Sequence, residues 1–248
     1  MSKRAASSNH AMTPSKIRRL ETEAPSLMSK QLTIVVGVGD DEKTFYIHQN
    51  IVKDHSDFFA AALNKGWKEA EDGIVRLPTE VLAHFELFAR FVYFGKIYAA
   101  KAKADSEDDE AHATRVGVEA HVLFDCWIMG DRLMAVSFKD AVHDAITQLI
   151  RDERLIPVDF QNSVYPKTAG PNSLRRLLVD VAVWGWAKDI LPACEMDASW
   201  MEFFRDVAVR GQEANKAQHT MTAPFMKHGC VYHEHVAAGK PCYTGLFP

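Results

Sequence analysis

The feature that most constrains the fold is a change of hydrophobic period between residues 32 and 78. Residues 32–38 (LTIVVGV) alternate between two faces and are rich in β-branched side chains, which predicts a strand. The segment GDDEK supplies a turn, and residues 44–47 (TFYI) predict a second strand that completes a hairpin. From Ile51 to Leu63 the apolar residues recur at helical spacing instead. The folded part of the chain is therefore expected to mix strands and helices.

Capping and helix- or strand-ending residues divide the stretch that follows into separate elements. Ser56 lies inside the helical pattern and, as a good N-cap residue, predicts a break between two short helices. Residues 73–78 (GIVRLP) predict a third strand, which Pro78 ends. A further helical pattern starts at Thr79 and ends at Gly95, because glycine is common just past a helix C-terminus.

The rest of the chain is predicted to be mainly helical. Residues 99–117 have no period and an acidic centre, which predicts an exposed loop. Ser137 and Asp140 have capping-box spacing and indicate the start of a helix. Three prolines in residues 156–172 indicate a connector. The predicted helices cover residues 118–134, 137–150, about 173–190, and a segment from Trp200 to Val207.

Residues 1–29 form a basic tail that is poor in large apolar side chains, so we expect it to be disordered. Two basic clusters in this tail have the spacing of a two-part nuclear import signal. A tail that only increases solubility is the alternative interpretation. The candidate import residues are Lys3, Arg4, Lys16, Arg18 and Arg19.

Composition excludes several classes of protein. The net charge of -4 gives no general attraction for nucleic acid or for an anionic membrane. No apolar run approaches the roughly 20 residues that a membrane-spanning helix needs. The four cysteines are not arranged in a dense framework and no secretory signal is visible, so we expect reduced thiols in an intracellular protein of the nucleus, the cytoplasm or both.

Several short motifs occur in a fixed order between residues 45 and 97. A strand ends in Phe-x-x-His, and an apolar helix leads to Ser-x-x-Phe. An acidic turn, a strand of Ile-x-Leu type and a helix that finishes in Tyr-x-Gly-x-Ile follow. These motifs contain Phe45, His48, Ile51, Val52, Ser56, Phe59, Glu69, Glu71, Ile74, Val75, Leu77, Tyr93, Gly95 and Ile97. In this order they resemble the BTB/POZ domain, and the chain as a whole resembles stand-alone fungal BTB proteins.

The resemblance implies an α+β fold, in which helical hairpins flank a small three-stranded sheet and a C-terminal helical extension follows. The expected divisions are the basic tail (1–29), the BTB/POZ-like domain (30–150), the helical extension (151–220) and a tail with cysteine and histidine (221–248). The family often has an acidic residue before the first strand, where this chain has Gln31. Its dimeric members also exchange an N-terminal strand and helix, for which residues 1–29 offer no counterpart.

The function implied by the resemblance is protein–protein interaction. The partner would be a second copy, a related domain or a cullin ubiquitin-ligase scaffold, and a role as an adaptor in a transcription-linked complex would follow from nuclear import. The sequence itself shows no nucleophile or carboxylate at fixed spacing beside His48, so we do not expect an enzyme.

The C-terminal tail contains the one pattern that suggests a cofactor. Cys230, His233, His235 and Cys242 form C-x2-H-x-H-x6-C, and this set of thiolates and imidazoles suits tetrahedral zinc in a closed structural site. The alternative is a plain C-terminal loop, with no cofactor in the protein, because small Cys/His clusters also arise without metal. A zinc-containing, nucleic-acid-associated nuclear protein is the second functional hypothesis. Nucleic acid is nevertheless not the expected partner, because the tail has few cations to neutralise phosphates.

Overall fold

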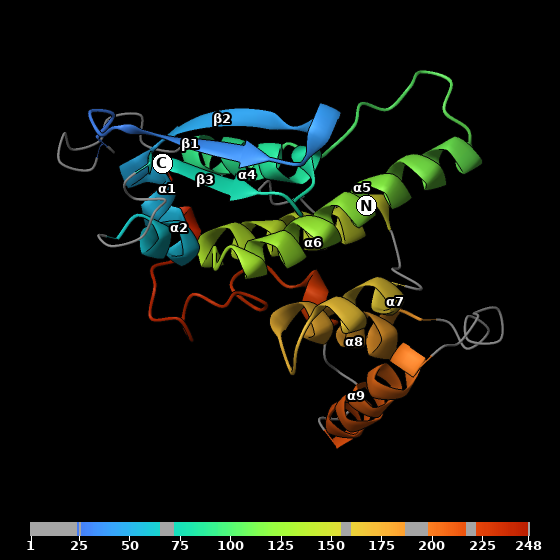
Figure 1. Cartoon of the computed structure of the whole chain (residues 1–248). Helices are drawn as coiled ribbons and strands as arrows, with labels where there is room; N and C mark the ends of the chain where they lie inside the picture. The colour runs from blue at the N-terminus through green and yellow to red at the C-terminus, as the bar shows by residue number, and fades with distance from the viewer. Residues whose placement is uncertain are drawn as a thin grey trace, which may run out of the picture.

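A three-stranded sheet lies against the helices of the N-terminal half in the computed structural model (Figure 1). The model describes residues 24, 26–64, 72–154, 160–186, 198–216 and 222–247. The strand order is β2-β1-β3, with β1 antiparallel to β2 and parallel to β3. The strands are β1 (Gln31–Val36), β2 (Lys43–His48) and β3 (Ile74–Leu77). The small sheet flanked by helices confirms the predicted α+β class.

The strands follow the predicted alternation closely. Leu32, Ile34 and Val36 on β1 are fully buried and form the inner face of the sheet. Ile34 pairs with Phe45 of β2 and with Val75 of β3, so the register places apolar side chains side by side across the inner face.

Ser56 separates two short helices, as its sequence position predicts. These are α1 (Gln49–His55) and α2 (Asp57–Ala62). The hydroxyl oxygen of Ser56 accepts a hydrogen bond from the backbone N–H of Phe59 at 3.2 Å, which caps α2. The same hydroxyl donates to the carbonyl of Leu133 at 2.6 Å, so the cap also fixes the helix pair to a distant turn.

Helix α4 (Leu82–Phe94) packs against the sheet through three buried phenylalanines, Phe85, Phe88 and Phe91. Gly95 ends this helix with a left-handed φ of 63°, as predicted. The helix starts three residues later than the pattern from Thr79 suggests. The reason is that Glu80 turns inward, where its carboxylate accepts two hydrogen bonds from Arg132, at 2.8 and 2.6 Å.

The prediction of a loop over residues 99–117 is wrong for its second half, because α5 (Asp109–Arg132) starts there. The side chain of Asp108 caps the helix by accepting the backbone N–H of Ala111 at 2.8 Å. Asp109 and Glu110 then occupy the first turn, where negative charge interacts favourably with the helix dipole. The acidic run therefore marks a helix N-terminus.

The predicted capping box at Ser137 and Asp140 is also wrong. Helix α6 (Val136–Glu153) starts earlier, and its N-cap position is Ala135, which makes no side-chain cap. Ser137 lies 3.2 Å from Nδ1 of His55 instead. Asp140 is fully buried and accepts hydrogen bonds from a segment near the C-terminus.

The helical extension packs beneath α5 and α6 (Figure 1). Residues 160–167 are helical rather than a plain connector, and residues 155–159 lie outside the described part. Trp186, just past α8, packs on Trp200 and Phe203 of α9, with centroid distances of 6.3 and 5.6 Å. The elements are α7 (Phe160–Val164), η3 (Tyr165–Lys167), α8 (Ser173–Gly185) and α9 (Ala198–Lys216).

Residues 222–247, called the C-terminal segment below, run along α6 and contact both halves of the molecule (Figure 1, red). The segment contains η5 (Pro224–Met226) and α10 (Tyr243–Leu246). Tyr232 donates a hydrogen bond to Asp180 of α8 at 2.8 Å, and Lys240 binds Asp57 of α2 at 2.7 Å. Within the described residues, no helix has both the length and the apolar character needed to cross a membrane.

Candidate metal centre

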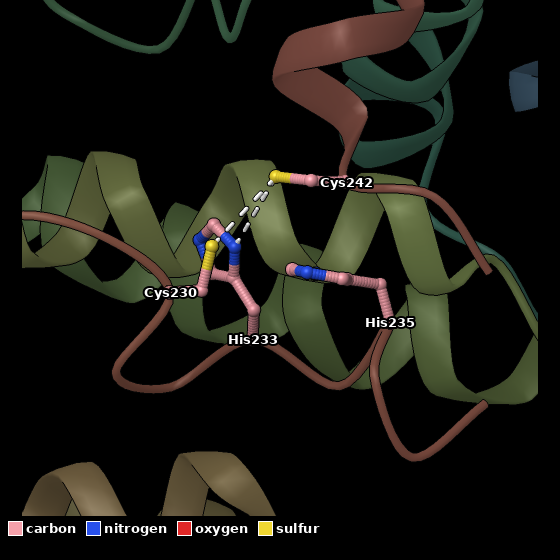
Figure 2. Close-up of side chains that lie close together, drawn as sticks. All are labelled: Cys230, His233, His235 and Cys242. Carbon is pink, nitrogen blue, oxygen red and sulfur yellow. Dashed lines mark hydrogen bonds between the residues drawn. The ribbon is translucent and has the colours of Figure 1, made fainter. Parts of the chain in front are cut away.

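The four residues of the predicted metal motif come together in the C-terminal segment. One potential ligand atom from each of Cys230, His233, His235 and Cys242 lies within 4.8 Å of those of the others. The two Sγ atoms are 3.9 Å apart, and Sγ of Cys242 is 3.7 Å from Nδ1 of His233 (Figure 2). The structure thus brings the whole predicted set to one place.

Local backbone structure returns Cys242 to the other three residues. A turn after His235 is closed by the N–H of Lys240, which donates to the carbonyl of His235 at 2.8 Å. Gly239 adopts a left-handed φ of 64° inside this turn, a conformation that glycine reaches without steric cost. Cys242 then occupies the N-cap position of α10, with its side chain directed toward His233 (Figure 2).

His233 is oriented by a carboxylate of α6. Its Nε2–H donates to Oδ1 of Asp144 at 3.0 Å, and its Nδ1 faces Sγ of Cys242. The other oxygen of Asp144 accepts the hydroxyl of Tyr243 at 2.6 Å. The carboxylate therefore fixes the ring orientation of His233.

His235 has an equivalent partner one helical turn earlier. Its Nδ1–H donates to Oδ2 of Asp140 at 2.8 Å, so Nε2 is the nitrogen left for a ligand. Asp140 also accepts the backbone N–H groups of Glu234 and His235, at 2.7 and 3.3 Å. This buried carboxylate thus holds the main chain of the motif as well as its second histidine.

Burial and hydrogen bonds within the cluster also shift the pKa values of its members. Burial opposes a positive charge on His233, but the hydrogen bond and the negative charge of Asp144 outweigh it and raise the pKa of His233 to about 9. Burial likewise opposes a thiolate at Cys242, yet hydrogen bonds from Thr244 and His233 lower the pKa of this thiol. His233 and Cys242 therefore favour their charged forms, whereas burial and the neighbouring Cys242 raise the pKa of the Cys230 thiol.

A buried lysine of α6 binds the residue between the two histidines of the motif. Lys139 Nζ donates to Asp131 at 2.7 Å and to Glu234 at 2.5 Å, and it lies 4.7 Å from the centroid of the Trp127 ring. Glu234 also accepts the hydroxyl of Ser173 at 2.7 Å. The residue between the two histidines thus connects α6 with α8.

Sequence reasoning did not identify Asp140 and Asp144 as partners of the motif. The available signal was their spacing of one helical turn, which puts both carboxylates on one side of α6. Nothing in the sequence linked that side of α6 to a motif some ninety residues later.

The other predicted site residues have different outcomes. Lys3, Arg4, Lys16, Arg18 and Arg19 lie outside the described residues, as do Glu69 and Glu71 of the BTB/POZ pattern. The ring of His48, at the end of β2, contacts a residue near the end of α4. Its Nδ1 lies 2.9 Å from the hydroxyl of Tyr93, so two residues of the pattern contact each other.

Comparison with known proteins gives no assignment. No protein-family model matches the chain, and the search of curated proteins finds no match.

Proposed function

We propose that this protein is an interaction module of the BTB/POZ type, which binds another protein through exposed aromatic side chains at the end of α4. The observation that carries the proposal is a row of three aromatic residues, Tyr93, Phe94 and Tyr98, called the aromatic patch below. Phe94 is 60% exposed and Tyr98 is 52% exposed. Large exposed aromatic side chains are favoured at the centre of protein interfaces.

The aromatic patch is continuous and held in place. The rings of Tyr93 and Phe94 have centroids 6.4 Å apart, and those of Phe94 and Tyr98 are 6.3 Å apart at an interplanar angle of 90°. The hydroxyl of Tyr93 also contacts His48, both at the ring and at the backbone N–H. A preorganised surface of this kind loses little side-chain entropy on binding.

The order of the elements supports the family resemblance. An antiparallel hairpin, a pair of short helices and a third strand parallel to the first precede α4 and the α5–α6 pair. The motif Tyr-x-Gly-x-Ile of the resemblance contributes Tyr93 to the aromatic patch. The partners that the resemblance implies, a second copy or a cullin scaffold, are the ones to test.

The nucleic-acid hypothesis has less support among the described residues. Asp140, Asp144 and Glu234 surround the Cys/His motif, and their negative charges disfavour a phosphate backbone at that place.

A binding experiment on the full chain tests the proposal. Self-association is measured by light scattering over a range of concentrations, and binding to a purified cullin is measured in parallel. We expect a complex in at least one of the two, and a loss of at least about tenfold in affinity for Phe94→Ser, as for an interface hot spot.

Met201→Ser is the matched control, because Met201 is 78% exposed on α9 and lies outside the aromatic patch. Its affinity should equal that of the wild type. The absence of both complexes, or equal losses for the two variants, would rule out the aromatic patch as the binding surface.

Nuclear import by the basic tail is a separate part of the proposal. A fluorescent fusion of the full chain should accumulate in the nucleus, and replacing Lys16, Arg18 and Arg19 by alanine should distribute it evenly. A wild-type fusion that stays outside the nucleus would contradict an import function.

A further inference from the structure

We infer that Cys230, His233, His235 and Cys242 bind a single Zn²⁺ ion, and that this ion cross-links the C-terminal segment, whose two histidines donate to carboxylates of α6. The site is separate from the aromatic patch and does not depend on the proposed binding function. Two thiolates and two imidazoles are a common ligand set for structural zinc.

The distances fit one tetrahedral ion. With Zn–S bonds of about 2.3 Å and Zn–N bonds of about 2.0 Å, a tetrahedron has S···S edges of about 3.8 Å and S···N edges of about 3.5 Å. The observed separations are 3.9 Å between the sulfurs of Cys230 and Cys242, and 3.7 Å between Cys242 Sγ and His233 Nδ1. The other pairs of ligand atoms lie within 4.8 Å of one another, so the coordination sphere is completed by moving side chains closer together within this segment.

Two other uses of the same residues fit less well. A disulfide between Cys230 and Cys242 needs an S–S distance of about 2.05 Å, and both cysteines are free thiols. A two-iron cluster with two cysteines and two histidines places its sulfur ligands on one iron and its nitrogen ligands on the other. The close approach of Cys242 to His233 indicates ligands of one ion instead.

The surroundings of the histidines strengthen the assignment. Metal-binding histidines usually donate their second N–H to a carboxylate, which orients the ring and makes the free nitrogen a better ligand. His233 and His235 both do so, toward Asp144 and Asp140 of α6. Two such pairs in one cluster give the site the outer layer of hydrogen bonds that structural metal centres have.

Charge and protons balance in the loaded site. Zn²⁺ binds both cysteines as thiolates and His233 through an unprotonated Nδ1, so any protons that these three atoms carry pass to solvent. Two thiolates then neutralise the two positive charges of the ion. All four coordination positions are filled by protein, so the ion has no open position for a substrate and its role is structural.

The position of the site explains what the ion would stabilise. On one side of the motif Tyr232 binds Asp180 of α8, and on the other Lys240 binds Asp57 of α2. The ion would connect the two flanks of the C-terminal segment at the middle of this path. Folding of the segment is thereby linked to metal binding.

Metal analysis of the full-length protein is the direct test. Protein purified without added chelator should contain one zinc per chain. His233→Asn should lose this zinc, whereas His228→Asn should keep it, because His228 is exposed close to the motif but does not belong to the cluster. Asp144→Asn should retain the four ligands and bind zinc about 10- to 100-fold more weakly, as expected for a positioning residue.

Thiol labelling of the wild type keeps the test independent of how the variants fold. A chelator should make Cys230 and Cys242 reactive, added zinc should protect both again, and buried Cys126 should stay unreactive throughout. Titration with Co²⁺ should produce the visible absorption bands of a tetrahedral thiolate site. Wild-type protein that takes up no zinc from solution, or labelling that zinc does not change, would overturn the inference.

Discussion

The ring of Phe247 stacks on the ring of His55, with centroids 5.0 Å apart and an angle of 13° between their planes, although the two residues lie near opposite ends of the described chain. Phe247 also meets Phe91 of α4 edge-on at 5.1 Å. The end of the C-terminal segment thus covers the junction of α1 and α4. This contact packs the segment against the core of the N-terminal half.

Phe247→Ala should therefore destabilise the whole fold. Phe247 is only partly buried, so we expect a loss of about 1–3 kcal/mol in the free energy of unfolding, below the value for a full core phenylalanine. Urea unfolding followed by circular dichroism measures this change. The neighbouring Leu246 is 43% exposed, and Leu246→Ala should change stability by less than about 0.5 kcal/mol. Equal effects of the two substitutions would contradict the docking of Phe247.

Gly95→Ala should lower the free energy of unfolding by more than the strain of a left-handed φ alone explains. A Cβ at this position would overlap the ring of Phe247, in addition to the strain of a φ of 63°. Gly73 is the matched control, since its φ is 65° but a Cβ there would meet nothing within 4 Å. We expect a loss of about 1 kcal/mol in the free energy of unfolding for Gly73→Ala, and a clearly larger loss for Gly95→Ala. In the background of Phe247→Ala the two glycine substitutions should become similar, which a double-mutant cycle would show.

Lowering the pH should weaken the fold through His55. Burial, the largest effect, lowers the pKa of His55 to about 4, against an opposing effect of Asp54 and with a smaller contribution from Lys240. The groups packed around it are Ser137 and the rings of Phe91 and Phe247. Because the folded pKa lies below the unfolded value of 6.5, the unfolded chain binds the proton first, and stability falls as the pH drops from 6.5 toward 4.

The expected contribution of His55 between pH 7 and pH 5 is a loss of up to about 2 kcal/mol. His55→Asn retains an acceptor toward Ser137 but does not titrate. Unfolding free energies of the two proteins at both pH values measure the difference, while other groups cancel. If His55→Asn lost as much stability on acidification as the wild type, His55 would not be the group responsible.

Asp180 should make Tyr232 important for stability. This buried carboxylate accepts a hydrogen bond from the Tyr232 hydroxyl at 2.8 Å and from Nε of Arg210 at 2.7 Å. Tyr232→Phe removes one partner of a buried charge, and we expect a cost of about 1.5–3 kcal/mol in unfolding free energy. Tyr46→Phe, at a position 63% exposed on β2, should be nearly neutral. A neutral Tyr232→Phe would mean that water replaces the hydroxyl at Asp180.

Local patterns predicted the sheet and most of the helices correctly, because each depends on neighbouring residues. The alternation in β1, the cap at Ser56 and the left-handed Gly95 are of this kind. The missed start of α5 had a local signal in the cap at Asp108, but two other errors fall where a polar residue has a distant partner. Glu80 binds Arg132 and delays the start of α4, and Asp140 binds the C-terminal segment and so does not cap α6.

The metal motif also has a part that the sequence revealed and a part that only the tertiary structure revealed. Its four side chains lie within one short segment, so the sequence alone identified them as a possible ligand set. Asp140 and Asp144 come from a helix far earlier in the chain, and only the packing of the C-terminal segment on α6 brings them to the histidines. Sequence by itself determined the strands, the helix break at Ser56 and the four candidate ligands, since these follow from short-range periodicity and spacing. The tertiary structure decided the distances among these four side chains, their hydrogen-bond partners and the packing of Phe247 over the junction of α1 and α4. Such contacts between remote segments depend on how the whole chain packs.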